Sequence, residues 1–269
     1  MSRANTIGFI GLAAKEIALK ASTIISMVPT AKHVRQVYLG NDGVLPALKF
    51  LDRTEVQQTL CIDGSTIEQE ESRAIAKTLK DEGAEMIDAP VSGGVVGAER
   101  ATLAIMVGAS KEAFERSKPV LEPMGRRVTH CGDNGAGLAA KIANNTYTDK
   151  RNVREAMLLG KKLGLEPQVL ANIINESTGR CWSSVSNNPV PEVNIEDASP
   201  PAQRDYQGGF VTKLAHKDLA LAVSASGSVG LPLHLGKFVE QLYRPLAQPE
   251  SPYSNRDFSS IYKVFESES

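Results

Sequence analysis

Asp88-Ala-Pro-Val-Ser-Gly-Gly-Val-Val-Gly-Ala98 and Gly135-Ala-Gly-Leu-Ala-Ala-Lys-Ile-Ala-Asn-Asn145 are the two stretches of sequence that decide the fold. Before the second stretch, short apolar runs alternate with helix-like segments, which predicts an α/β domain with a largely parallel sheet. After it, helical patterns follow one another without an intervening strand. The sequence therefore predicts an α/β domain over residues 1–133 and an all-helical domain over residues 134–269.

The predicted strands are short and apolar, as expected for a parallel sheet that is covered on both faces. They lie at Thr6–Leu12, Ser22–Pro29, Gln58–Asp63, Glu85–Asp88, Leu103–Val107 and Arg127–Cys131. Helices are predicted at Ala14–Lys20, Ala31–Leu39, Phe114–Met124 and from Ser65-Thr66 to about Glu82. In the second domain they are predicted at Gly137–Asn144, Val153–Gly164, Pro167–Asn175, Lys213–Val229 and Leu235–Leu246. Residues 184–210, rich in Pro, Asn and Ser, are expected to form a functional or interface loop.

Composition and charge exclude several classes of partner. The chain has 269 residues, of which 23% are charged, and a formal net charge of −1, so nothing draws it to nucleic acid or to a membrane surface. No apolar stretch approaches the ~20 residues that a membrane-spanning helix needs. The three cysteines and four histidines have no metal-ligand spacing, so no metal is predicted and a reducing compartment is favoured. The N-terminal residues run directly into a predicted strand, which leaves no room for a transit peptide.

Ser92-Gly93-Gly94 is the first candidate binding site. Successive glycines free backbone N–H groups to surround an anion, and the Ser92 hydroxyl adds a donor for a carboxylate. A lone Ser-Gly-Gly is more often only a flexible turn, and that alternative has to be weighed on the surrounding sequence.

Lys141 is the candidate catalytic residue. It lies on a predicted helix that opens at Gly135 and Gly137, among alanines and isoleucine. Apolar surroundings disfavour the charged ammonium form of lysine relative to the neutral amine. They therefore lower the pKa towards the range that is useful for proton transfer. Asn145 lies one turn further along the same face. The alternative is an exposed lysine on an amphipathic helix.

Together the two stretches resemble the signatures of the β-hydroxyacid dehydrogenase family. The resemblance implies a truncated Rossmann-type domain, followed by an all-α domain of the 6-phosphogluconate dehydrogenase C-terminal type. It implies NAD as cofactor, a small-molecule β-hydroxyacid as substrate, and a homo-oligomer. In this family Lys141 would be catalytic, and the substrate would be bound by Ser92, Gly93, Gly94 and Asn145. Motifs after residue 177 resemble the branch that oxidises 3-hydroxyisobutyrate in valine degradation, which implies mitochondria, with the cytoplasm as the alternative.

The cofactor end follows the family less closely. A dinucleotide site opens with a strand, a GxGxxG turn and a helix, and an acidic residue about 20 positions later holds the adenosine ribose. Here Ala13-Ala14-Lys15-Glu16 takes the place of the second and third glycines, and the second strand with its acidic end is missing. The resemblance assigns the remaining cofactor contacts to Gly8, Gly11, Leu12, Val28, Pro29, Thr66 and Lys217. For Ser65-Thr66 a helix N-cap is the alternative role.

Two interpretations of the shortened cofactor end stay open. In one, NAD binds through the remaining contacts, with an altered adenosine pocket. In the other, the chain is a splice form or paralogue without a complete NAD site, which binds only substrate or full-length subunits. Two smaller departures from the family are Ala101, where a glycine is usual, and the polar stretch 146–152, where an apolar interdomain helix is usual.

Overall fold

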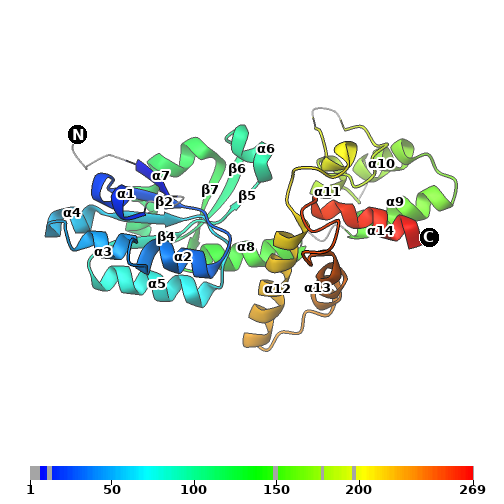
Figure 1. The fold of residues 1–269 in the computed structure, drawn as a ribbon. Coiled ribbons are helices and arrows are strands. Elements are labelled where there is room, and N and C mark those ends of the chain that lie inside the picture. The colour runs from blue at the N-terminus through cyan, green and yellow to red at the C-terminus, as the bar shows by residue number, and fades with distance from the viewer. Residues whose placement is uncertain (1–6, 11–13, 148–150, 177–178, 196–197, 269) are drawn as a thin grey trace. The chain divides into compact units, whose positions relative to one another are not determined.

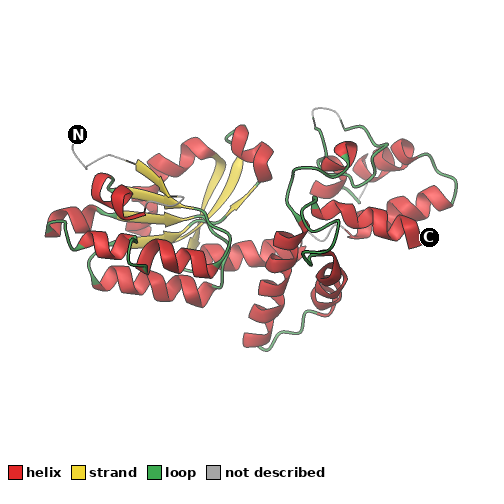
Figure 2. Cartoon of the chain, viewed as in Figure 1, coloured by secondary structure: helices red, strands yellow, loops and turns green. Residues whose placement is uncertain are grey.

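The computed structural model describes residues 7–10, 14–147, 151–176, 179–195 and 198–268. The chain divides into two compact units, Met1–Ala143 and Asn144–Ser269. The first combines helices and strands, whereas the described part of the second contains helices and loops (Figures 1 and 2). The predicted fold class, a shortened α/β domain followed by a helical region, is confirmed.

The first unit is built on a sheet of seven strands among the described residues. The strands are β1 (Ile7–Ile10), β2 (Thr23–Ser26), β3 (Leu60–Asp63), β4 (Glu85–Asp88), β5 (Val91–Ser92), β6 (Leu103–Gly108) and β7 (Gly125–Gly132). Their order is β1-β2-β3-β4-β6-β5, with β7 paired to β6. The pairs β1–β2, β2–β3, β3–β4 and β6–β7 are parallel, whereas β6 runs antiparallel to β4 and β5. The strand β1 therefore lies at one edge of the sheet (Figure 1).

Helices cover both faces of this sheet. Alternate residues of each strand point to opposite faces, so each strand contributes side chains to two cores. Ile24, Cys61 and Met86 pack in one core with residues of α1, α2, α3 and α5, while Ile25, Ile62 and Ile87 pack in a second core with residues of α7. The helices are α1 (Ala14–Lys20), α2 (Ala31–Leu39), α3 (Val44–Leu48), α4 (Arg53–Gln58), α5 (Gln69–Asp81), α6 (Gly94–Glu99), α7 (Lys111–Leu121), η1 (Glu122–Met124) and α8 (Ala136–Tyr147).

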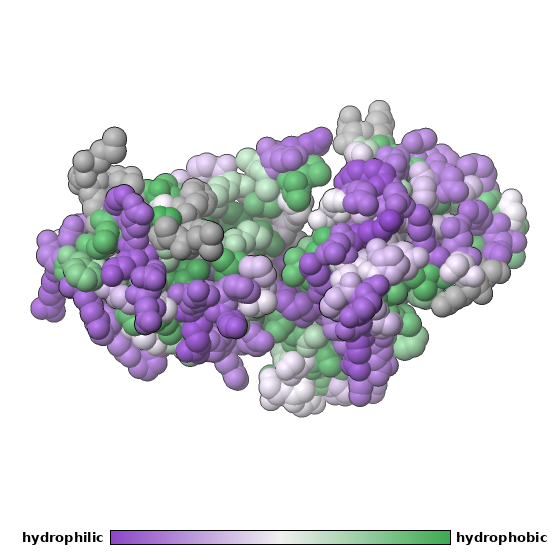
Figure 3. Space-filling model, in the orientation of Figure 1, coloured by the Kyte–Doolittle hydropathy of each residue, from purple (hydrophilic) through white to green (hydrophobic). Residues whose placement is uncertain are grey.

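The second unit is helical in its described part. Its helices are α9 (Arg151–Lys162), α10 (Pro167–Glu176), α11 (Trp182–Val185), η2 (Pro201–Arg204), α12 (Thr212–Ser228), α13 (His234–Leu246), η3 (Phe258–Ser260) and α14 (Ile261–Glu268). Met157, Val193 and Tyr262 belong to one core, and Val239 and Tyr243 to another. Hydrophilic residues predominate on the face drawn in Figure 3, with hydrophobic ones in smaller patches. Among the described residues, no helix is both long and apolar enough to cross a membrane.

Three element predictions need correction. The helix predicted from Ser65 begins at Gln69, with Glu68 at the N-cap position, because the Ser65 side chain is engaged elsewhere. The strand predicted to reach Pro29 ends at Ser26. The short helices α3, α4, α6 and α11 were not predicted, nor was the C-terminal helix α14. Residues 148–150 of the polar stretch lie outside the described residues.

Candidate active site

The candidate site lies in the first unit, where three parallel strands end together. The register aligns Ser26 of β2, Asp63 of β3 and Asp88 of β4, each the last residue of its strand. Loops that leave the carboxyl ends of parallel strands are where open α/β sheets bind ligands. Val28-Pro29 and Ser65-Thr66 belong to these loops, and Val91-Ser92 follows β4 by two residues.

Ser92, Gly93 and Gly94 connect β5 to α6. Gly93 has φ of +146° and Gly94 φ of +62°, conformations that L side chains rarely adopt, so both positions require glycine. An added Cβ at Gly94 would meet no atom within 4 Å, so the backbone there faces open space. Ser92 is half-buried and the two glycines are exposed. The segment therefore presents accessible backbone and a hydroxyl group, as the carboxylate site predicted from the sequence requires.

Lys141 is buried on α8, with 9% of its surface exposed. The position of α8 is determined by Asp88, whose Oδ1 accepts a hydrogen bond from the Gly135 N–H at 2.5 Å and whose Oδ2 accepts one from the Leu138 N–H at 2.8 Å. A carboxylate at the N-terminus of a helix stabilises it, because the first backbone N–H groups have no hydrogen-bond partner inside the helix. Lys141 lies one turn after Leu138, so Asp88 ties the candidate catalytic helix to the end of β4.

Close backbone packing also holds α8 against the sheet. A Cβ at Gly137 would collide with the Met106 carbonyl oxygen, and a Cβ at Gly108 would collide with the Asp88 carboxylate. Asn134 Nδ2 donates to the Met86 carbonyl at 2.9 Å, and Gln69 Nε2 donates to the Gly135 carbonyl at 2.8 Å. The start of α8 is thus bound to β4 and to the first residue of α5.

Asp63 organises the loops after β2 and β3. It is buried, and its Oδ1 accepts hydrogen bonds from Ser26 Oγ and Ser65 Oγ, both at 2.7 Å. Ser65 Oγ in turn accepts the Val28 N–H at 2.9 Å. The alternative role of Ser65 as a helix N-cap is therefore wrong: the side chain connects the two loops instead. Its neighbour Thr66 is half-buried on the same loop.

Burial raises the pKa of Asp63 to about 6, although hydrogen bonds from Ser65 and Ser26 oppose the shift. The folded protein therefore binds more protons than the unfolded chain between about pH 4 and 6, and stability falls as pH rises through that window. Replacing Asp63 by Asn removes this dependence. We expect the unfolding free energy of Asp63→Asn, relative to the unchanged chain, to rise by about 2 kcal/mol between about pH 4.5 and 7.5. Urea denaturation at both pH values measures it; a difference that does not vary with pH would contradict it.

Ala101, where the family usually has glycine, adopts a left-handed conformation with φ of 53°. The cost of this conformation for a residue with a Cβ is about 1 kcal/mol. We expect Ala101→Gly to raise the unfolding free energy by about 0.5–1 kcal/mol. Ala98→Gly, in the neighbouring helix α6, is the matched control and should lower it by a similar amount. Equal effects of the two substitutions in urea denaturation would contradict the strain at Ala101.

The other predicted residues are placed less completely. Gly11 and Leu12 lie outside the described residues, as does the Asn145 side chain. Lys217 lies on α12 of the second unit, with Nζ 3.2 Å from Asp218 Oδ1. The neighbouring His216 is half-buried and its Nε2 lies 2.7 Å from Glu240 Oε1. In the described part of the chain no group of His, Cys, Asp and Glu side chains is suited to a metal ion.

Sequence reasoning assigned no role to Asp63 or Asp88. Both are buried acidic residues at the ends of apolar strands, and that pattern is the signal that could have pointed to them.

Two family models together match most of the chain. The NAD-binding domain of 6-phosphogluconate dehydrogenase matches residues 8–132, and the NAD-binding domain of NADP-dependent 3-hydroxyisobutyrate dehydrogenase matches residues 135–265. The mitochondrial 3-hydroxyisobutyrate dehydrogenase of Mus musculus is 41% identical over 255 residues, which cover 94% of this chain and 72% of that protein. The chain belongs to the 3-hydroxyisobutyrate dehydrogenase family.

A bacterial relative and a solved structure agree with this assignment. The 3-hydroxyisobutyrate dehydrogenase of Pseudomonas aeruginosa is 40% identical over 247 residues, covering 91% of this chain and 80% of that protein. The structure of the Mycobacterium tuberculosis 3-hydroxyisobutyrate dehydrogenase with L-serine matches with a TM-score of 0.80 at 37% identity, covering 93% of this chain and 81% of that one. The family consists of NAD-dependent oxidoreductases acting on β-hydroxyacids, and NAD is the cofactor. The comparisons do not support the alternative of an impaired form that only binds substrate or full-length subunits.

The predicted cofactor contacts Val28 and Thr66 lie where a dinucleotide site is expected, at the carboxyl ends of parallel strands. Ser65, Thr66 and Val28 lie on two loops that one buried network holds together at the carboxyl ends of β2 and β3. A Cβ at Gly8 would collide with Ile17 of α1, so glycine lets β1 pack closely on this helix, and the cofactor contact assigned to Gly8 stays a prediction.

Proposed function

We propose that this chain catalyses the NAD-dependent oxidation of 3-hydroxyisobutyrate to methylmalonate semialdehyde, a step of valine degradation. The observation that carries the proposal is the buried Lys141 on a helix that Asp88 anchors to the strand preceding Ser92-Gly93-Gly94. The names of the relatives supply the substrate.

Each residue has a separate task in the proposed reaction. The Ser92 hydroxyl and the backbone N–H groups of Gly93 and Gly94 bind the substrate carboxylate. The neutral Lys141 amine accepts the proton of the substrate hydroxyl as the C–H bond beside it breaks. NAD, when bound, accepts the hydride from that carbon. Thr66 holds the nicotinamide ribose, Val28-Pro29 lies near the adenosine side, and the roles carried over to Asn145 and Lys217 remain predictions.

The proposal is tested by following NAD reduction with 3-hydroxyisobutyrate, its methyl ester, glycerate and 6-phosphogluconate. We expect turnover with 3-hydroxyisobutyrate and at least tenfold lower kcat/KM with the ester, which lacks the carboxylate charge. Faster oxidation of another β-hydroxyacid would reject the proposed substrate while leaving the family activity in place. No turnover with any of them, from folded protein, would reject the activity.

A homo-oligomer and a mitochondrial location belong to the same proposal. Four apolar residues are at least half exposed: Leu159 of α9, Leu163 in the turn after it, and Val169 and Ile173 of α10. They support association through the helical unit. Relatives from Mus musculus and Dictyostelium discoideum are named as mitochondrial. Light scattering of the purified chain measures its mass, and imaging of the tagged chain against a mitochondrial marker tests its location.

A further inference from the structure

The position of β1 bears on how much of NAD this chain contacts. In dinucleotide-binding domains the strand that carries the glycine turn has a strand on each side, and the cofactor spans the crevice where the strand order reverses. Here β1 is the first strand of the order β1-β2-β3-β4, so among the described residues it pairs with β2 alone. Among the described residues, α1 is the element that lies between these two strands in the chain.

The strand end beside β1 is occupied by a structural network. An adenosine ribose is normally held by an acidic residue at the end of a strand neighbouring β1. That strand is missing from the described residues; the strand that pairs with β1 is β2, which ends at Ser26, whose Oγ donates to Asp63 and lies 2.6 Å from the Tyr38 hydroxyl. Ser26 is 1% exposed, so it offers no surface to a ribose.

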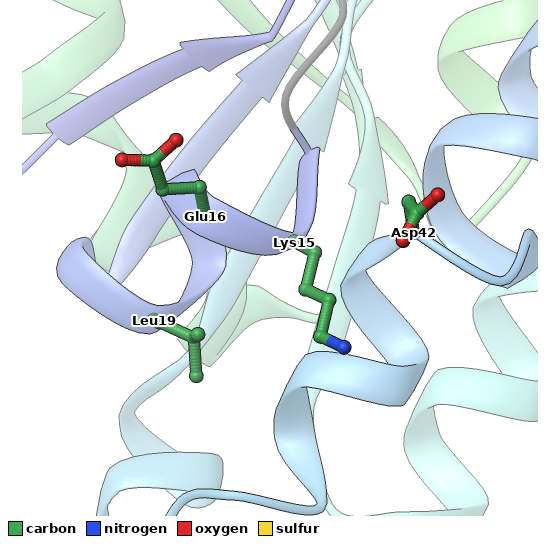
Figure 4. A pocket seen from close by; sticks show the side chains of 4 residues that line it. All are labelled: Lys15, Glu16, Leu19 and Asp42. Atoms are coloured by element: carbon green, nitrogen blue, oxygen red, sulfur yellow. The ribbon is translucent and has the colours of Figure 1, made fainter.

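The surface of α1 is also poorly suited to a pyrophosphate. A pocket of about 330 Å³ on this helix is lined by Lys15, Glu16, Leu19 and Asp42 (Figure 4). Glu16 is paired with Lys20 and Asp42 lies beside Lys15 in the lining, so the pocket offers no excess of positive charge to an anionic ligand. Lys15 Nζ lies 5.0 Å from the centre of the Phe50 ring, and in Figure 4 it points away from the Glu16 carboxylate.

The loops that follow β2 and β3 are held together by buried hydrogen bonds. Val28, Ser65 and Thr66 lie on loops that the buried Asp63 joins through hydrogen bonds of 2.7–2.9 Å. A preorganised loop pair loses little conformational entropy when a ligand binds. Within the described part of the first unit, Thr66, the predicted nicotinamide ribose contact, therefore lies on a loop that is already fixed before binding.

We propose that this chain binds NAD through its nicotinamide mononucleotide half, so that the adenosine half contributes little affinity and reduced nicotinamide mononucleotide is an alternative cofactor. The proposal rests on the proposed function, because it takes Thr66 as the nicotinamide ribose contact. It differs from the usual dinucleotide site, in which both halves are held.

Calorimetric titration of the whole chain with NADH, reduced nicotinamide mononucleotide and ADP-ribose tests the proposal. We expect the first two to bind with dissociation constants within tenfold of each other, a difference below about 1.4 kcal/mol, and ADP-ribose not to compete with NADH. NADH binding that is more than tenfold tighter, or competition by ADP-ribose, would overturn the inference. If neither nicotinamide compound binds to folded protein, the cofactor site of the proposed function fails as well.

Matched variants show which residues contact each half. Thr66→Ala is expected to weaken NADH and reduced nicotinamide mononucleotide by the same factor. Lys15→Ala and Asp42→Asn, which change the pocket on α1, are expected to leave both dissociation constants unchanged within twofold. A loss of NADH affinity alone in either pocket variant would assign the adenosine half to that pocket and overturn the inference.

Discussion

Replacement of Lys141 by alanine is expected to lower kcat for 3-hydroxyisobutyrate by about 10²–10⁴-fold, the usual contribution of a positioned general base. The amine is buried on α8, and α8 is fixed to the end of β4 through Asp88. Without the amine, the hydroxyl proton has no acceptor when the neighbouring C–H bond breaks. Steady-state kinetics with NAD and 3-hydroxyisobutyrate measure the loss.

Two further measurements separate a chemical role of Lys141 from a structural one. Lys141→Arg keeps the positive charge but cannot act as a base, so it should be nearly as inactive as the alanine variant. A small primary amine added to Lys141→Ala should restore part of kcat, whereas it should not restore Lys141→Arg, in which the space is filled. NADH binding by both variants should match the unchanged chain. Unchanged turnover in Lys141→Ala would reject the mechanism.

The central sheet could be predicted from sequence because its strands are apolar on both faces. Ile24-Ile25 and Cys61-Ile62 alternate between two cores, and such runs are distinctive even in a short strand. The start of α5 was mispredicted for a local reason. Ser65 has the side chain of an N-cap, but the buried Asp63 accepts its hydroxyl hydrogen and the helix begins four residues later. Short helices such as α3 and α4 contain too few residues for the helical repeat of apolar residues to be recognised in the sequence.

The candidate site was predictable where function depends on adjacent residues. Ser92-Gly93-Gly94 and Lys141 were assigned because the stretches around them resemble family signatures, since the short motifs alone are more often a flexible turn and an exposed lysine. The roles of Asp63 and Asp88 depend instead on hydrogen bonds between residues 37 to 50 positions apart in the chain. No local pattern reports such a partner, so the network that positions both loops and the catalytic helix emerged only from the fold.

Replacement of Asp88 by alanine is expected to lower the unfolding free energy by about 2–6 kcal/mol. Two buried donors, the N–H groups of Gly135 and Leu138, would lose their acceptor, and each such loss costs about 1–3 kcal/mol. A domain is usually stable by only about 5–15 kcal/mol, so this variant approaches the limit of folding. Urea denaturation of the purified variant measures the change. A loss below about 1 kcal/mol would show that Asp88 does not anchor α8.

Asp88→Asn tests whether the hydrogen bonds from the start of α8 to Asp88 also affect catalysis by Lys141. One amide oxygen can satisfy one of the two N–H groups, while the amide NH₂ faces the other, so we expect a smaller loss of stability than in Asp88→Ala and a folded protein. Because α8 carries Lys141, a displaced helix start should lower kcat more than it weakens NADH binding, whose proposed contacts depend on Asp63 instead. Equal losses in kcat and in NADH affinity would mean that Asp88 supports the whole sheet edge rather than the catalytic helix.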